Sequence, residues 1–196
     1  MHLLASTTGV ISDGEEAVDL LQTPGDIVIL SAADSDLACL SAAQNRMTDG
    51  SLSLRLANIL RLNHNLSVDL YVEKILRNAR MIVVRLIGGT SYWPYGLSEV
   101  RAIAIEYGIK LVVVPGDDKS DPELMGHSTL SSEIVNRFWM YFTHSGVDNA
   151  LNLLKYAYCI LGEEVLWKEP ALLLKAGFYW PLMDLPSLTD LQKNWQ

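Results

Sequence analysis

The chain has 196 residues, of which 49% are hydrophobic, and its formal net charge is −8. This length and apolar content are enough to bury one good core, so we expect one α/β domain followed by a tail. The negative charge argues against binding to nucleic acid or to an anionic membrane surface, because both recruit positively charged proteins. Small molecules and other proteins remain as binding partners.

The negative charge is concentrated at the start of the chain. No Lys or Arg precedes Arg46, whereas seven carboxylates do: Asp13, Glu15, Glu16, Asp19, Asp26, Asp34 and Asp36. We favour a solvated acidic face, since carboxylates scattered along a sequence are usually exposed. The alternative is a patch for a basic partner or a divalent cation.

The cysteines and the apolar runs bear on where the protein works. Cys39 and Cys159 lie far apart in apolar contexts, which leaves no disulfide framework and no CxxC motif. No apolar run approaches the roughly 18 to 20 residues of a membrane span. The first residues, Met1 to Ile11, lack the basic region of a secretory signal. We therefore expect a soluble, cytoplasmic protein.

Apolar runs of strand length alternate with segments of helical period, which is typical of parallel βαβ units. Continuous Val, Ile and Leu in these runs indicate strands that are covered on both faces. The expected strands are Asp26–Ala32, Arg80–Gly88 and Lys110–Gly116, with Leu3–Ser6 and Ser53–Asn58 as weaker candidates, and the expected helices are Asp36–Met47, Ser67–Ala79 and Ser98–Tyr107. Ser67 is the expected N-cap of its helix and Gly108 the expected C-cap of the last one. The pattern predicts a flavodoxin-like or Rossmann-like open parallel sheet flanked by helices, over residues 1–125.

Two longer helices are expected after the sheet, at Ser131–His144 and Val147–Leu161. Both carry apolar stripes, and Ser145–Gly146 joins them, so residues 126–165 should form a helical hairpin packed on the α/β domain. After Gly162 several prolines interrupt the pattern. Residues 166–196 are therefore interpreted as an incomplete tail that leads into a further domain.

The loop after the second strong strand is the candidate site, because open parallel sheets bind ligands beyond the carboxyl ends of their strands. It contains Gly88 and Gly89, followed by Tyr92, Trp93 and Tyr95. The aromatics could form a flat wall for a large conjugated ligand, or a surface for another domain. Alternatively, the loop is rigid and its aromatics pack over the sheet edge. Nucleotide binding is disfavoured, since neither GxGxxG nor a P-loop accompanies the glycines.

Other motifs give weaker signals. Asp117, Asp118, Asp121 and Glu123 resemble a hard-cation loop, of which the three aspartates are the candidate metal ligands, but their spacing fails the EF-hand pattern, and a solvated loop is preferred. The four histidines lack zinc-site spacing. No GxSxG motif is present, and neither cysteine has the sequence signature of a nucleophile. No catalytic residue is predicted.

Four segments carry a resemblance to a known family: Asp13–Leu37, Ser53–Leu76, Arg80–Gly96 and Val113–Leu124. Two specific stretches within them are GGTSYWPYG and PGDDKSDPEL. They resemble the opening of the CobN family, the cobaltochelatase large subunits, which are relatives of the magnesium chelatase large subunit. The resemblance implies a part in the ATP-dependent insertion of cobalt into hydrogenobyrinic acid a,c-diamide in cobalamin biosynthesis.

The same resemblance implies a division of labour. The family's large subunit binds the corrinoid and the metal, and two AAA+-type subunits hydrolyse ATP. Family members continue several-fold beyond this chain, so it resembles their N-terminal domain, and no catalytic role transfers to its residues. Cobalt and ATP are expected in the whole complex and not on this chain. The alternatives are a free-standing flavodoxin-like binding module and a non-catalytic scaffold domain.

Overall fold

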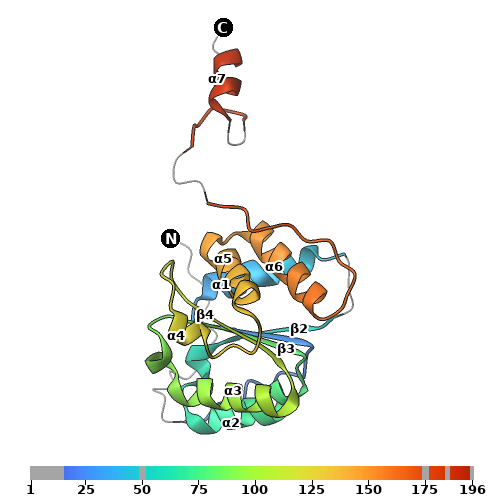
Figure 1. The fold of residues 1–196 in the computed structure, drawn as a ribbon, viewed down its shortest axis with the longest axis vertical. Coiled ribbons are helices and arrows are strands. Elements are labelled where there is room, and N and C mark those ends of the chain that lie inside the picture. The colour runs from blue at the N-terminus through green and yellow to red at the C-terminus, as the bar shows by residue number, and fades with distance from the viewer. Residues whose placement is uncertain (1–15, 49–51, 174–176, 184–185, 195–196) are drawn as a thin grey trace.

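The structure is a computed structural model that describes residues 16–48, 52–173, 177–183 and 186–194. Its centre is a parallel sheet of β1 (Ile27–Ser31), β2 (Leu54–Asn58), β3 (Met81–Leu86) and β4 (Lys110–Pro115), in the order β2-β1-β3-β4 (Figure 1). This is the strand order of the flavodoxin-like doubly wound fold. The predicted α/β class and open parallel sheet are confirmed.

Helices cover both faces of the sheet (Figure 1). The crossover from β1 to β2, through α1 (Asp34–Arg46), runs opposite to those through α2 (Asn65–Lys74) and α3 (Pro94–Tyr107). Because parallel crossovers are right-handed, α1 lies on one face and α2 and α3 on the other. The hairpin of α5 (Ser132–His144) and α6 (Val147–Ile160) joins α1 on its face. The shorter helices are η1 (Ile59–Leu62), η2 (Leu76–Asn78), η3 (Thr90–Tyr92), α4 (Pro122–Met125) and α7 (Leu188–Asn194).

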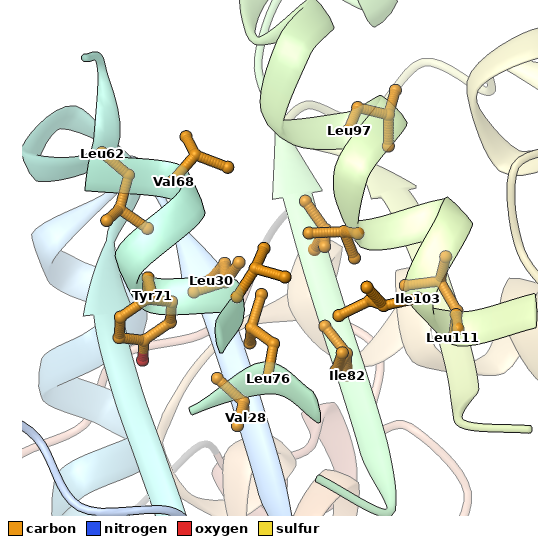
Figure 2. Close-up of a cluster of buried hydrophobic side chains, with 14 of the residues drawn as sticks. Val28, Leu30, Leu62, Val68, Tyr71, Leu76, Ile82, Leu97, Ile103 and Leu111 are labelled. Carbon is orange, nitrogen blue, oxygen red and sulfur yellow. The ribbon is translucent and has the colours of Figure 1, made fainter. Parts of the chain in front are cut away.

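Alternate residues of the strands belong to two separate hydrophobic clusters, one on each face of the sheet. Val28 and Leu30 face α2 and α3, in the cluster shown in Figure 2, whereas Ile27 and Ile29 face α1, α5 and α6. All four are completely buried. Strands covered on both faces need apolar residues at every position, which explains the continuous Val/Ile/Leu runs of the sequence.

The predicted elements are largely confirmed, with two corrections at helix starts. Ser67 is not an N-cap: α2 begins two residues earlier, with His64 as its cap, and the buried Ser67 hydroxyl accepts a hydrogen bond from Val18 N at 2.7 Å. Helix α3 begins at Pro94 and not at Ser98, since proline suits the first helical turn. Gly108 ends α3 with φ +68°, as predicted. The weak strand Leu3–Ser6 lies outside the described residues.

The acidic residues of the first segment correct another prediction. Asp36 is buried, with 7% of its surface exposed. All four aspartates in the described part of this segment, Asp36 included, are held by a partner from elsewhere in the chain, so the segment is not simply a solvated acidic face. The pairs are Asp19–Lys74, Asp26–Ser53, Asp34–Asn58 and Asp36–Arg85.

The first residues of the predicted tail lie along the helical hairpin. The Asn149 side chain donates to Ala171 O at 2.9 Å and accepts from Ala171 N at 2.8 Å. The Trp167 ring packs against Tyr156 in a tilted arrangement, with ring centroids 4.6 Å apart. These contacts fix the path of the chain up to about residue 171. The division of domains at residues 125 and 165 stays a prediction. Within the described residues, no helix has the length and apolarity needed to span a membrane.

Candidate functional site

The topological switch point of the sheet lies between β1 and β3, where ligands of open α/β sheets usually bind. Here the protein's own polar side chains fill it. Arg85 Nη1 lies 2.6 Å from Asp36 Oδ1, and Arg85 Nη2 donates to Gly116 O at 2.8 Å. The Ser31 hydroxyl donates to Asp36 Oδ2 at 2.7 Å. The cluster therefore connects the ends of β1, β3 and β4 to α1.

This cluster is buried beneath the helical hairpin. The side chains of Arg85 and Asp36 are only 11% and 6% exposed, and the guanidinium lies 5.2 Å from the centroid of the Phe142 ring. Removing one member of a buried ion pair is far costlier than the pair is stabilising, because the other charge is left uncompensated. Sequence reasoning missed this cluster. The available signal was Arg85 itself, a lone charge within the apolar strand MIVVRL.

The glycine pair after β3 brings two loops together. Gly88 and Gly89 adopt φ values of +89° and +73°, which side chains rarely tolerate. A Cβ on Gly89 would lie 3.4 Å from Asp121 Oδ2 in the loop after β4. The glycines therefore turn the chain out of the sheet and allow close approach of the acidic loop.

Trp93 is not part of an exposed aromatic wall, which corrects that part of the predicted site. It is 5% exposed and belongs to the core beneath α2 and α3. Its Nε1 donates to Leu62 O at 2.9 Å. The ring occupies space left by Gly96, where a Cβ would lie 1.9 Å from Trp93 Cε2. The alternative interpretation, an aromatic that packs back on its own sheet, describes Trp93.

The two tyrosines of the loop differ from Trp93. Tyr92 is 42% exposed and remains available to a ligand or another domain. Tyr95 is half-buried and donates from its hydroxyl to Asp69 Oδ1 at 2.6 Å, which joins the start of α3 to α2. The hydrogen bond to Asp69, together with burial, raises the pKa of Tyr95 to about 12. Tyr95 therefore acts as a hydrogen-bond donor at neutral pH.

The acidic loop after β4 uses its carboxylates to build turns. Asp117 Oδ1 accepts from Lys119 N at 3.1 Å, and Asp121 Oδ1 accepts from Leu124 N at 2.9 Å as the N-cap of α4. Asp118 lies between them. In the described part of the chain, no three His, Cys, Asp or Glu side chains are grouped so that they could hold a metal ion. The loop is explained by its role in chain reversal.

A groove beside the glycine loop was not foreseen from the sequence. It has a volume of about 640 Å³ and lies between α3 and the residues of α4 and its C-terminal end. Its polar lining includes Thr90, Ser98, Arg101, Glu123 and His127. No local pattern links Arg101 to His127, because β4 and α4 lie between them in the chain.

No family model matches the chain. Two curated relatives are both called aerobic cobaltochelatase subunit CobN. The one from Sinorhizobium sp is 47% identical over 181 residues, which cover 92% of this chain and 14% of the relative. The one from Pseudomonas aeruginosa is 40% identical over 197 residues, which cover all of this chain and 16% of the relative.

A solved structure agrees with these relatives. The catalytic subunit of cobaltochelatase from Mycobacterium tuberculosis superposes with a TM-score of 0.61 and 27% identity. The match covers 79% of this chain and 12% of that one. The chain is therefore an α/β domain that is similar in sequence and fold to a segment of cobaltochelatase subunits. More particularly, the chain is homologous to part of the CobN subunit, which confirms the resemblance carried by its GGTSYWPYG and PGDDKSDPEL motifs. It spans only 14–16% of the length of these relatives.

Proposed function

We propose that the chain works as the N-terminal domain of a cobaltochelatase large subunit. It would take part in the ATP-dependent insertion of cobalt into hydrogenobyrinic acid a,c-diamide during cobalamin biosynthesis. The observation that supports this proposal is 40–47% identity to two CobN subunits over 92–100% of the chain. Cobalt is a substrate in this proposal, and the AAA+-type subunits hydrolyse the ATP.

The proposed role of the domain is binding and scaffolding, with the chemistry performed by the remainder of the complex. The polar groups at the carboxyl edge of the sheet support this role. Asp36 and Arg85 neutralise each other, and Asp117 and Asp121 form turns and a helix cap. These residues hold the loops in place and so present them to a partner.

The C-terminal segments supply a candidate contact with the remainder of the large subunit. Large apolar side chains are strongly exposed there, at Leu173 (71%), Tyr179 (86%) and Leu182 (107%). Exposed apolar residues that gather into a patch commonly mark an interaction surface. The hydrogen bonds between Asn149 and Ala171 hold the chain just before these residues, so the segment leaves the domain in a defined place.

The proposal can be tested in a chimaeric subunit. The matching segment of the P. aeruginosa relative is replaced by this chain, and cobalt insertion is measured with the ATPase subunits present. We expect insertion close to that of the unmodified relative. A double substitution Tyr179→Ser with Leu182→Ser should reduce insertion or subunit association. Leu66→Ser, at a residue 50% exposed on α2, is the control and should have no effect.

Two outcomes contradict separate parts of the proposal. A chimaera that folds and assembles but inserts no cobalt contradicts the function. A chimaera that is active with and without the apolar substitutions contradicts the assignment of the contact surface.

A free-standing binding module is the second candidate. It is favoured by the covering of the sheet, since helices among the described residues pack on both of its faces. Such a module would bind its ligand equally well alone and within a larger subunit. Comparing the affinity of the isolated chain and of the chimaera for the corrinoid separates the two candidates.

A further inference from the structure

The groove between α3 and α4 combines an apolar wall with polar groups. Pro94, Leu97, Ala102 and Ile105 form the apolar part, and Ile105 is 66% exposed. Its volume of about 640 Å³ lies within the range of small-molecule sites, about 300 to 1,000 Å³. A large apolar side chain left in water beside such a hollow favours a ligand with an apolar body.

The two basic side chains of the groove are uncommitted. Within the described residues, neither the exposed guanidinium of Arg101 nor the imidazole of His127 makes a hydrogen bond or ion pair. His127 Nδ1 is shielded from solvent and still has no partner there. In contrast, Arg55, Arg80 and Arg137 all bond to other parts of the chain. A shielded polar atom without a partner is costly, so polar side chains in this position usually have a ligand or a partner to bind.

A second groove on the other side of α4 shows what distinguishes the first. It has a similar volume, about 680 Å³, and its lining includes Ser120, Ser128, Glu133 and Asn136. Its lining within the described residues contains no Lys, Arg or His. The basic groups are therefore specific to the groove beside the glycine loop, in a chain whose net charge is −8.

We propose that this groove binds a carboxylate of a small molecule whose body is largely apolar. Arg101 supplies a charge-assisted hydrogen bond to the carboxylate, and the hydroxyls of Thr90 and Ser98 are further donors. The apolar wall contacts the body of the ligand. Resting on the proposed function, the ligand is the corrinoid acid, whose carboxylate side chains project from an apolar macrocycle. Glu123, at the edge of the same groove, opposes the binding of a carboxylate.

This arrangement predicts opposite effects for two substitutions. The 196-residue chain is titrated with hydrogenobyrinic acid a,c-diamide, and binding is followed by the absorbance of the corrin. Arg101→Gln should weaken binding about 10-fold or more, the usual effect of losing one charge-assisted hydrogen bond. Glu123→Gln should strengthen binding, because it removes a repulsive charge. Arg61→Gln is the control: it removes the same charge from an exposed residue beyond β2, at the opposite edge of the sheet.

Several results would overturn the inference. It is wrong if the unmodified chain shows no saturable binding, or if Arg101→Gln and Arg61→Gln have equal effects. Equal affinity for a corrinoid with esterified carboxylates would also refute recognition through a carboxylate. The chimaera measures insertion independently of the titration. An inactive chimaera with the expected titration results therefore contradicts the proposed function alone, whereas an active chimaera with failed titrations contradicts this inference alone.

Discussion

Replacing Trp93 with alanine tests whether the aromatic loop is held by its own domain. The ring is 5% exposed and its Nε1 donates to Leu62 O at 2.9 Å. Truncation of a buried Trp to Ala costs about 3 to 5 kcal/mol, through lost burial and the cavity left behind. The unpaired Leu62 carbonyl contributes about 1 to 3 kcal/mol of such a loss. We therefore expect Trp93→Ala to lower the free energy of unfolding by about 3 to 5 kcal/mol.

The assay is urea unfolding followed by far-UV circular dichroism, which does not depend on the removed fluorophore. Tyr92→Ala is the matched control, because Tyr92 lies next to Trp93 but is 42% exposed. Its effect should stay within about 0.5 kcal/mol. A loss below about 1 kcal/mol for Trp93→Ala would refute the buried position of the ring.

Gly96→Ala provides a second test of the same packing, because its effect on stability should change sign when Trp93 is absent. The added Cβ would lie 1.9 Å from Trp93 Cε2, so the ring must shift. Overpacking of this kind costs about 1 to 3 kcal/mol. When Trp93→Ala is already present, the clash is gone, and Gly96→Ala should stabilise the helix by about 0.5 to 1 kcal/mol. Destabilisation of equal size in both backgrounds would contradict direct packing of Gly96 against Trp93.

Three further predictions concern stability. Asp36→Leu alone should lower the free energy of unfolding by about 3 to 5 kcal/mol, because it leaves Arg85 buried and unpaired. Adding Arg85→Met should restore part of this loss in urea unfolding, and a further loss of stability would contradict this reasoning. The backbone N–H and hydroxyl of Ser53 donate to Asp26 and hold the pKa of this carboxyl below the usual value. The stabilising effect of Asp26 is therefore complete above about pH 4 and is lost as pH falls through the lower folded pKa. Asp26→Asn should make the acid loss of stability shallower, and an unchanged pH profile would refute this contribution. Gly108→Ala should lower the free energy of unfolding by about 1 kcal/mol, because φ is +68°. A Cβ there meets no atom within 4 Å, so the loss comes from backbone strain and not from a clash. An unchanged melting temperature would contradict a left-handed residue at this helix end.

Much of the fold could be predicted because the amino-acid composition of the strands reflects their burial on both faces. Runs such as Ile27–Ser31 and Met81–Leu86 are apolar at successive positions, as burial on both faces demands. Ser53–Asn58 could be predicted only as a weaker strand candidate, because Arg55 interrupts its apolar residues. Gly108 was predictable because a left-handed residue after a helix is a local requirement.

The candidate site could be predicted only in part, because its key contacts join distant residues. The indole N–H of Trp93 donates to the carbonyl of Leu62, 31 residues earlier in the chain. The partner of Arg85 is Asp36, 49 residues away. No single-sequence pattern pairs residues across such separations, so the aromatic loop and the acidic segment were both interpreted as more exposed than they are.

The central claim is that the chain is a binding and scaffolding domain of a cobaltochelatase. The most direct test compares cobalt insertion by the isolated chain with insertion by the chimaeric subunit. Both are assayed with hydrogenobyrinic acid a,c-diamide, cobalt, ATP and the ATPase subunits. If the chain is a binding and scaffolding domain of a cobaltochelatase, the chimaera inserts cobalt and the isolated chain neither inserts cobalt nor hydrolyses ATP. Insertion by the isolated chain, or none by a folded chimaera, would contradict the account.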